Sequence, residues 1–310
     1  MFPGATDERE RADAAAQSDR DGGTNAEGRE ADRGGHTDTR GRTPDRGGAN
    51  FVVVGAPLDA STTFRPGARF GPRRIRHFSE TFDDYDHRTD QYFSDLGVAD
   101  HGDVRAWDDV DEYLEWLEGT LRDVVWDDAV PLVLGGEHTV SLAGARAVEP
   151  EVVVTLDAHL DLRDEYDGNP LSHACVTRRI LEEVDSVEEA VVLGARTGSE
   201  EEWNRATADD VTVVPPEDVA DWEPDADLAA RDVYCSVDVD AADPAYAPGT
   251  GTAEPFGLEP REMRDVVRAL APAATGFDVV EVNDRDDGQA AALAGKLVRE
   301  FVYSHAAERR

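Results

Sequence analysis

Three side chains that can bind a metal follow an apolar run near the middle of the chain. Residues 152–156 read Val-Val-Val-Thr-Leu, and this β-branched run predicts a buried strand. Asp157, His159 and Asp161 follow it at alternate positions, so they can share one side of the chain at the end of the strand. Carboxylates and imidazole without thiolate suit a hard or borderline divalent ion such as Mn²⁺. The competing interpretation is a polar turn after a strand, where Asp is common.

Two further strands end in the same kinds of side chain. The apolar run 233–237 is followed by Asp238 and Asp240. The run 131–134 leads through a Gly-Gly turn to His138. Open α/β sheets bind ligands beyond the carboxyl ends of their strands, so these side chains can converge there. Together, the three strand ends offer six donors: His138, Asp157, His159, Asp161, Asp238 and Asp240. Six donors are too many for one catalytic ion, but they fit two ions that share carboxylates, about 3.5–4 Å apart.

The elements that must position these donors alternate along the chain. The pattern predicts strands at 51–55, 93–98, 131–135, 151–156, 190–194, 211–214, 233–239 and 275–282. It predicts helices from 72, at 110–124 and 139–148, up to 184, and at 199–208, 226–231, 260–271 and 288–303. Alternating strands and helices indicate a single three-layer α/β/α domain over residues 50–310, with a mainly parallel sheet.

The composition is strongly acidic. Asp and Glu number 68 against 31 Lys and Arg, which gives a net charge of −37, and Lys296 is the only lysine. The acids are spread over the whole chain, which indicates a hydrated, self-repelling surface and a proteome adapted to high salt. Such a charge argues against nucleic-acid binding, which needs a basic face.

The first 49 residues differ from the rest. They are rich in Gly, Asp, Arg and Thr with almost no large apolar side chains, so we expect a disordered tail over 1–49. No apolar signal region opens the chain and no apolar run is long enough to cross a bilayer, so we expect a cytoplasmic protein without a membrane partner. The two cysteines, Cys175 and Cys235, are expected to be buried and reduced.

Taken together, the motifs resemble those of the ureohydrolases, the arginase and agmatinase family. Gly-Gly-Glu-His at 135–138 resembles the first metal motif of the family, 157–161 the second, and 236–240 with Asp243-Pro244 the third. The resemblance covers nearly all of residues 51–303. Three motifs in this order, each at a strand end, are far more specific than any one of them.

The resemblance implies two Mn²⁺ ions per subunit that share a hydroxide. One ion would take His138, Asp157, Asp161 and Asp238. The other would take Asp157, His159, Asp238 and Asp240, so that Asp157 and Asp238 bridge. The chemistry agrees, because a guanidinium is a poor electrophile and paired metals make a strong nucleophile from water at neutral pH. The resemblance also suggests a homo-oligomer, a trimer or a hexamer.

Three residues would carry further roles by resemblance. Glu281 matches the strand-end glutamate that pairs with the guanidinium, which a carboxylate can do through two parallel hydrogen bonds. His173 matches the mobile proton shuttle, and imidazole has a suitable pKa for that role. Asp161 could also pass the proton to the leaving amine. The competing interpretations are an ordinary strand-end acid at 281 and a helix-start histidine at 173.

The segments 65–72, 172–175 and 247–252 resemble the agmatinase branch of the family. Arginases hold the substrate α-carboxylate with an Asn where Arg163 stands, and the α-amine with an Asp near the position of Ser199. Both departures count against arginine as the substrate.

We therefore expect the reaction of agmatine with water to give putrescine and urea. Asp164, with its acidic neighbours Glu165 and Asp167, is the hypothetical anchor for the substrate amine, whereas Arg163 could pair with the carboxylate of a guanidino acid. Asn-Asp-Arg-Asp at 283–286 departs from the proline-rich turn usual in the family and concerns the outer pocket only.

The alternatives are another ureohydrolase substrate (guanidinobutyrate, aminopropylagmatine or arginine) and a non-catalytic metal-binding paralogue. A deacetylase-type enzyme with one zinc is disfavoured, because the donors complete two sites. The non-catalytic reading has no support, since every donor position is filled.

Overall fold

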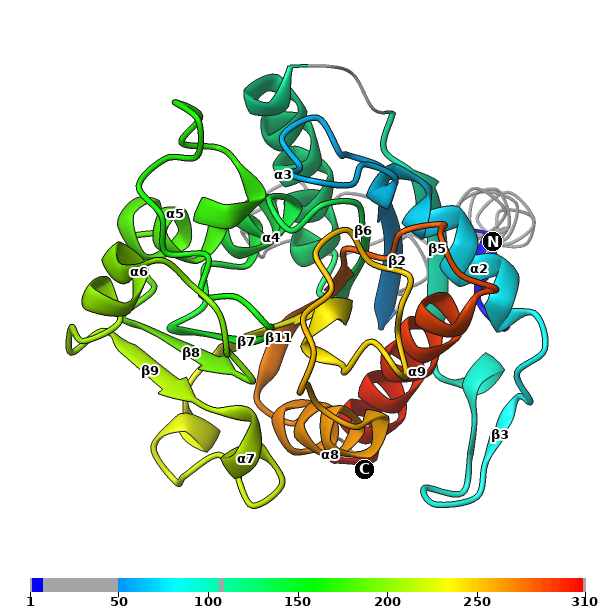
Figure 1. Cartoon of the computed structure of the whole chain (residues 1–310). Helices are drawn as coiled ribbons and strands as arrows, with labels where there is room; N and C mark the ends of the chain where they lie inside the picture. Colours follow the sequence, from blue (N-terminus) through cyan, green and yellow to red (C-terminus); the bar gives the residue numbers. More distant parts are fainter. Residues whose placement is uncertain (1, 8–49, 106–108, 309–310) are drawn as a thin grey trace, which may run out of the picture.

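The computed structural model describes residues 2–7, 50–105 and 109–308, and these are built around a nine-stranded sheet (Figure 1). Every neighbouring pair of strands in this sheet is parallel. From one edge to the other the strands are β1 (Thr6–Asp7), β5 (Val98–Asp103), β2 (Phe51–Ala56), β6 (Val130–Gly135), β11 (Ala274–Val280), β10 (Val233–Asp238), β7 (Val152–Leu156), β8 (Glu189–Leu193) and β9 (Val211–Val214). A separate antiparallel pair consists of β3 (Tyr85–Asp86) and β4 (Gln91–Tyr92).

The helices form two layers on the faces of the sheet (Figure 1). One face packs against α2 (Gly71–Ser79), α8 (Pro260–Leu270) and α9 (Gln289–Glu308). The other packs against α3 (Val110–Trp126), α4 (Val140–Val148) and α5 (Val176–Glu183). Two short helices, α6 (Glu200–Arg205) and α7 (Pro216–Val219), lie beside β8 and β9 (Figure 1). This arrangement confirms the predicted three-layer architecture with a mainly parallel sheet.

The apolar strands follow from burial on both faces. Along β7, Val152, Val154 and Leu156 belong to one core, whereas Val153 belongs to the other. This is the two-residue period of a strand, and a strand covered on both sides needs apolar residues at every position. The run of β-branched residues is thus explained by burial on both faces.

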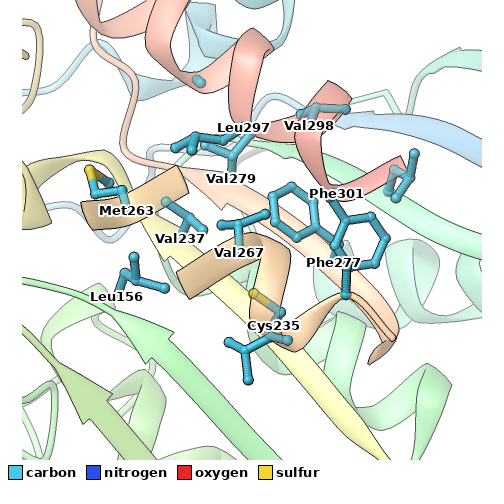
Figure 2. Packing of buried hydrophobic residues seen from close by; sticks show 14 of the residues in the cluster. Leu156, Cys235, Val237, Met263, Val267, Phe277, Val279, Leu297, Val298 and Phe301 are labelled. Atoms are coloured by element: carbon cyan, nitrogen blue, oxygen red, sulfur yellow. The ribbon is translucent and has the colours of Figure 1, made fainter. Parts of the chain in front are cut away.

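Strand β11 is fixed to α9 by aromatic packing. Phe277 on β11 and Phe301 on α9 stack with ring centroids 4.6 Å apart and an interplanar angle of 29°. Figure 2 shows these rings beside Val279 and Leu297, which come from the same two elements. The packing holds β11 in place, and β11 ends one residue before Glu281.

The expectation of a disordered tail over residues 1–49 is wrong for Phe2–Asp7. Phe2 is fully buried, and β1 pairs with β5 through Thr6 and Ala99. The backbone N–H of Phe2 donates to the buried carboxylate of Asp100. The buried ring of Phe2 holds this short strand on the sheet. The average composition of residues 1–49 does not reveal the contribution of a single aromatic residue. The rest of the predicted tail, residues 8–49, lies outside the described residues.

Two local predictions also differ from the structure. The strand expected at 93–98 is instead a 3-10 turn at Phe93–Asp95, followed by β5 at Val98–Asp103. The sequence did not indicate this strand, because β5 contains polar residues. One of them, Asp100, can be buried because it forms an ion pair with Arg76 at 2.8 Å. The helix expected at 226–231 is a single 3-10 turn, Leu228–Ala230, with no buried residue to hold a longer helix.

Candidate metal centre

Four adjacent strands bring the candidate residues to one edge of the sheet. The strands β6, β11, β10 and β7 are consecutive in the sheet. Leu156 on β7 pairs with Val237 on β10, and Asp238 on β10 pairs with Val280 on β11. The four parallel strands therefore end at a similar level, and the side chains that follow them converge, as expected for this class of sheet.

The first group of donors surrounds the imidazole of His138. Its Nδ1 lies 3.1 Å from Oδ2 of Asp157 and 3.0 Å from Oδ2 of Asp161. It also lies 3.5 Å from Oδ2 of Asp238. All four side chains are buried, so the donors face one another rather than solvent.

The second group lies beside the first and shares one residue with it. Nδ1 of His159 lies 3.5 Å from Oδ1 of Asp157 and 3.1 Å from Oδ2 of Asp240. Donor atoms of two trios, His138 with Asp157 and Asp238, and Asp157 with His159 and Asp240, lie within 4.8 Å of one another in each trio. All six predicted donors thus come together, and Asp157 belongs to both groups. Asp238 belongs to the first trio only, so its bond to a second ion stays a prediction.

Backbone N–H groups orient the carboxylates. One oxygen of Asp157 accepts from the N–H of His159 at 2.7 Å, and one of Asp238 accepts from the N–H of Asp240 at 2.8 Å. Oδ1 of Asp240 accepts from the N–H of Ala158 at 3.1 Å. In each of the three acids Oδ1 is held by the backbone, which leaves Oδ2 facing an imidazole. Asp161 is placed by an unusual backbone conformation, with a φ of 51°.

The chemistry of the donor set fits two divalent cations. Nδ1 of His138 and Oδ2 of Asp157 are buried and lie 3.1 Å apart, yet neither makes a hydrogen bond of good geometry with any described residue. Burial raises the pKa of Asp238 well above its usual value, and the charges of Asp240 and Asp157 raise it further. Burying several carboxylates together is costly unless cations balance them. Oxygen and imidazole donors without sulfur favour ions such as Mn²⁺.

Glu281 and His173 form a pair beside these donors. Oε1 of Glu281 accepts from the backbone N–H of His138 at 2.9 Å and lies 2.8 Å from Nδ1 of His173. Oε2 of Glu281 is buried without a hydrogen-bond partner among the described residues, and the residue has a φ of 60°. Burial disfavours the charged imidazole, but the charges of Glu281, Asp161 and Glu137 together outweigh burial and raise the pKa of His173 to about 9. Glu281 is thus a buried carboxylate with one free oxygen.

A cavity of about 210 Å³ opens beside the metal donors. Its lining consists of His159, Asp161, Arg163, Ala174, Thr197, Gly198, Ser199 and Glu202. Arg163, predicted to contact substrate, does line it and pairs with Glu202 at 3.2 Å. Asp164, predicted to anchor the substrate amine, does not: it pairs with Arg179 at 3.1 Å and its side chain is 62% exposed. The structure thus brings Arg163 to the site and places Asp164 outside it.

Sequence reasoning missed several residues that shape the site. Glu202 is one, although Ser199-x-x-Glu202 has the spacing of a capping box, and the structure contains that box at the start of α6. Thr63, whose hydroxyl lies 2.8 Å from Nε2 of His173, is another. Ser236 contacts His138 at 3.1 Å. Neither of these two contacts has a local signal, because they join positions 110 and 98 residues apart.

The two cysteines are free and buried, as predicted. Cys175 lies two residues after His173, but burial raises the pKa of its thiol to about 11. A thiol that stays protonated at neutral pH is a poor nucleophile.

Comparison with known proteins agrees with this geometry. A profile described as "Arginase family" matches residues 49–303. The chain is 35% identical over 258 residues to an agmatinase of Pyrococcus horikoshii, covering 81% of this chain and 90% of that protein. It is 36% identical over 264 residues to an N(1)-aminopropylagmatine ureohydrolase of Thermococcus kodakarensis, covering 81% and 88%.

Among solved structures, the agmatine ureohydrolase of Thermoplasma volcanium superposes with a TM-score of 0.78 at 35% identity, covering 84% of this chain and 91% of that one. The matched region includes every strand end that carries a candidate donor. The chain therefore belongs to the arginase family and is a hydrolase that acts on guanidino compounds.

Proposed function

We propose that this chain hydrolyses agmatine to putrescine and urea, with two Mn²⁺ ions at the six donors. The observation that carries the proposal is the free Oε2 of Glu281, buried beside two groups of metal donors that share Asp157. A buried carboxylate oxygen without a donor needs one, and a guanidinium can supply two parallel N–H groups to a carboxylate. Glu281 thus binds the guanidinium next to the nucleophile.

The reaction also needs a nucleophile and a proton donor for the leaving nitrogen. When bound, the two cations supply a strong nucleophile from water at neutral pH. Water adds to the guanidinium carbon, and the bond from that carbon to the substrate's chain nitrogen then breaks. The leaving nitrogen needs a proton to depart as an amine, and His173 or Asp161 delivers it.

The small polar cavity supports agmatine as the substrate. Oε2 of Glu202 accepts hydrogen bonds from the backbone N–H and hydroxyl of Ser199 at 2.8 and 2.9 Å, as well as contacting Arg163. A substrate amine at this end competes with Arg163 for the Glu202 carboxylate. N¹-aminopropylagmatine is the second candidate, because the Thermococcus relative is named for it. A guanidino acid is the third, because Arg163 lines the cavity.

The test is urea release by the purified protein, reconstituted with Mn²⁺, on a panel of four substrates: agmatine, N¹-aminopropylagmatine, 4-guanidinobutyrate and arginine. We expect agmatine to give the highest kcat/KM. If kcat/KM is at least tenfold higher for another compound of the panel, that compound and not agmatine is the substrate. Absence of urea from the whole panel would reject the proposal.

The identity of the metal has its own test. We expect two equivalents of Mn²⁺ per chain by elemental analysis, and higher activity with Mn²⁺ than with Zn²⁺ or Mg²⁺. One equivalent at full activity would refute the two-ion site. A matched control is Asp185→Asn, which removes an exposed carboxylate from the loop after α5 and should change neither metal content nor activity.

We also propose a trimeric or hexameric assembly in the cytoplasm of a cell with high internal salt. None of the helices in the described part of the chain is long and apolar enough to span a membrane. The net charge of −37 makes self-repulsion large at low ionic strength. Light scattering measures the mass of the assembly, and a monomer would contradict the proposed oligomer. A melting temperature that did not rise with KCl would contradict the proposed adaptation to high salt.

A further inference from the structure

We propose that Thr63 is a positioning residue that holds the imidazole of His173 through both its backbone N–H and its hydroxyl. The proposal rests on the proposed function, in which His173 carries a proton to the leaving nitrogen. The backbone nitrogen of Thr63 lies 2.9 Å from Nε2 of His173, and its Oγ1 lies 2.8 Å from the same atom. His173 is only 6% exposed, so these contacts replace water at Nε2.

The contacts determine which nitrogen of His173 carries the hydrogen. A backbone N–H can only donate, so Nε2 must offer its lone pair to Thr63. The hydrogen of the neutral ring then sits on Nδ1 and is donated to Oε1 of Glu281, 2.8 Å away. The Glu281 charge favours a protonated ring, whereas the Thr63 N–H opposes a proton on Nε2. The arrangement at Nε2 is that of the neutral ring.

The hydroxyl of Thr63 can contact Nε2 of His173 in both protonation states of the ring, whereas the backbone N–H can only donate. A hydroxyl can rotate and either donate or accept, so it can donate to the neutral Nε2 and accept from a protonated one. It therefore allows His173 to gain and lose a proton at Nε2 while the ring stays in place. The charged side chains that face the ring are Glu281, Asp161 and Glu137, all acidic, so none of them can take over this role as a donor.

The loop that carries Thr63 is tied to the segment that carries His173. Glu137 accepts from the backbone N–H of Ser61 at 3.0 Å and from its hydroxyl at 2.5 Å. The hydroxyl of Ser172 donates to the carbonyl oxygen of Ser61 at 3.3 Å. Ser61 is two residues before Thr63, and Ser172 directly precedes His173. The spacing between Thr63 and the imidazole is thus fixed from both sides.

Substrate binding gives this contact its importance. A guanidinium that binds both oxygens of Glu281 competes with the Nδ1–H of His173 for Oε1. Once that hydrogen bond is given up, Thr63 is what retains the ring beside the leaving nitrogen. Loss of the hydroxyl should therefore slow turnover more than it weakens substrate binding.

The test compares Thr63→Val, which removes the hydroxyl at nearly constant volume, with Thr63→Ser, which restores it. The matched control is Thr62→Val, since the Thr62 hydroxyl donates to the carbonyl oxygen of Thr63 at 3.5 Å and, among the described residues, makes no contact with His173. With Mn²⁺ and the best substrate of the panel, we expect Thr63→Val to lower kcat about tenfold with KM and manganese content within about twofold. We expect the pH profile of kcat to change as well, because the hydroxyl contacts Nε2 in both protonation states of the ring. Thr63→Ser and Thr62→Val should resemble the wild type.

Two results would overturn the proposal. One is a Thr63→Val variant with the wild-type kcat and pH profile. The other is equal impairment of Thr63→Val and Thr63→Ser, which would indicate packing rather than hydrogen bonding. Histidine ¹⁵N NMR supplies a readout that needs no turnover: we expect the Nδ1–H tautomer of His173 in the wild type. An Nε2–H tautomer would reject the role of Thr63 even if the proposed reaction holds, and a protein without ureohydrolase activity can still show the expected tautomer.

Discussion

The hydroxyl oxygen of Ser236 lies 3.1 Å from Nε2 of His138, on the side of the ring opposite the metal donors. The same hydroxyl donates to Oδ1 of Asp278 at 2.6 Å, so its lone pair is left to accept from Nε2–H. Tyr234 donates to Oδ2 of Asp278 at 2.8 Å. A buried carboxylate thereby fixes the tautomer of His138 and leaves Nδ1 free to bind an ion, as outer hydrogen bonds do in many metal sites.

Ser236→Ala should weaken Mn²⁺ binding about 10- to 100-fold, because His138 then loses the acceptor that fixes its ring. Titration of the metal-free protein with Mn²⁺ measures this affinity. The matched control is Ser79→Ala, which removes a buried hydroxyl that donates to the carbonyl oxygen of Ile75 on α2 at 2.7 Å. Equal affinity in Ser236→Ala and wild type would show that the Ser236 contact does not orient His138.

Asp157→Asn and Asp238→Asn should each lower metal content and abolish turnover. The change replaces a negative oxygen by an amide that can no longer bridge two cations. Elemental analysis gives the metal content, and urea release gives the activity. Two metals per chain with normal activity in either variant would refute the bridging role of that residue.

Glu281→Gln should retain both metals and raise the KM for the guanidino substrate about 10- to 100-fold. The variant keeps an acceptor for the His138 backbone N–H but loses the charge and one acceptor that face the guanidinium. Steady-state kinetics and metal analysis of the same sample test this. Glu217→Gln, an exposed acid on α7, is the control. An unchanged KM would remove Glu281 from the substrate site.

Removal of the metals should make the stability of the protein fall as the pH rises. Burial, and then the charge of Asp157, raise the pKa of Asp161 from 3.8 to about 6 in the folded protein without ions. A carboxyl whose pKa is raised by folding stabilises the fold fully below pH 3.8, and this contribution is lost as the pH rises through about 6. Urea unfolding between pH 4 and pH 7 measures the change. The Mn²⁺-bound protein is the reference at each pH. A metal-free protein that has the same free energy of unfolding at pH 7 as at pH 4.5 would contradict the prediction.

Phe2→Ala should lower the free energy of unfolding by about 3 kcal/mol, because it empties a fully buried aromatic site next to Phe93, whose ring centroid is 5.8 Å away. Phe256→Ala is the matched control, since that ring is 87% exposed. Denaturant unfolding measures both. Equal stability of the two variants would mean that the N-terminal segment does not dock on the sheet in solution.

The metal donors could be predicted because each lies within a few residues of a strand end, where local sequence reports both the strand and its polar ending. Asp157, His159 and Asp161 carry their own spacing, and parallel strands bring such endings together. Ser236 and Thr63 could not be predicted in this way. Their partners are set by which strands and loops become neighbours, and an isolated Ser or Thr has many local uses.

The docking of the N-terminal strand and the position of Asp164 could not be predicted from the sequence, for related reasons. Phe2 stands in a segment whose average composition is that of an unfolded chain, and only the Phe93 pocket reveals its role. Asp164 has the right charge and lies close in sequence to the metal motif, yet Arg178 and Arg179 hold it on the surface. Charge and sequence proximity did not determine the direction of its side chain.

Asp161 and Glu281 both adopt left-handed backbone conformations, with φ of 51° and 60°. Such a conformation costs a residue with a side chain about 1 kcal/mol, which a well-packed fold must supply. Glycine would relax the chain at either position and remove a carboxylate that the chemistry needs. Selection of this protein for heat resistance alone would therefore favour changes at these two positions, and its gains would come at the expense of catalysis.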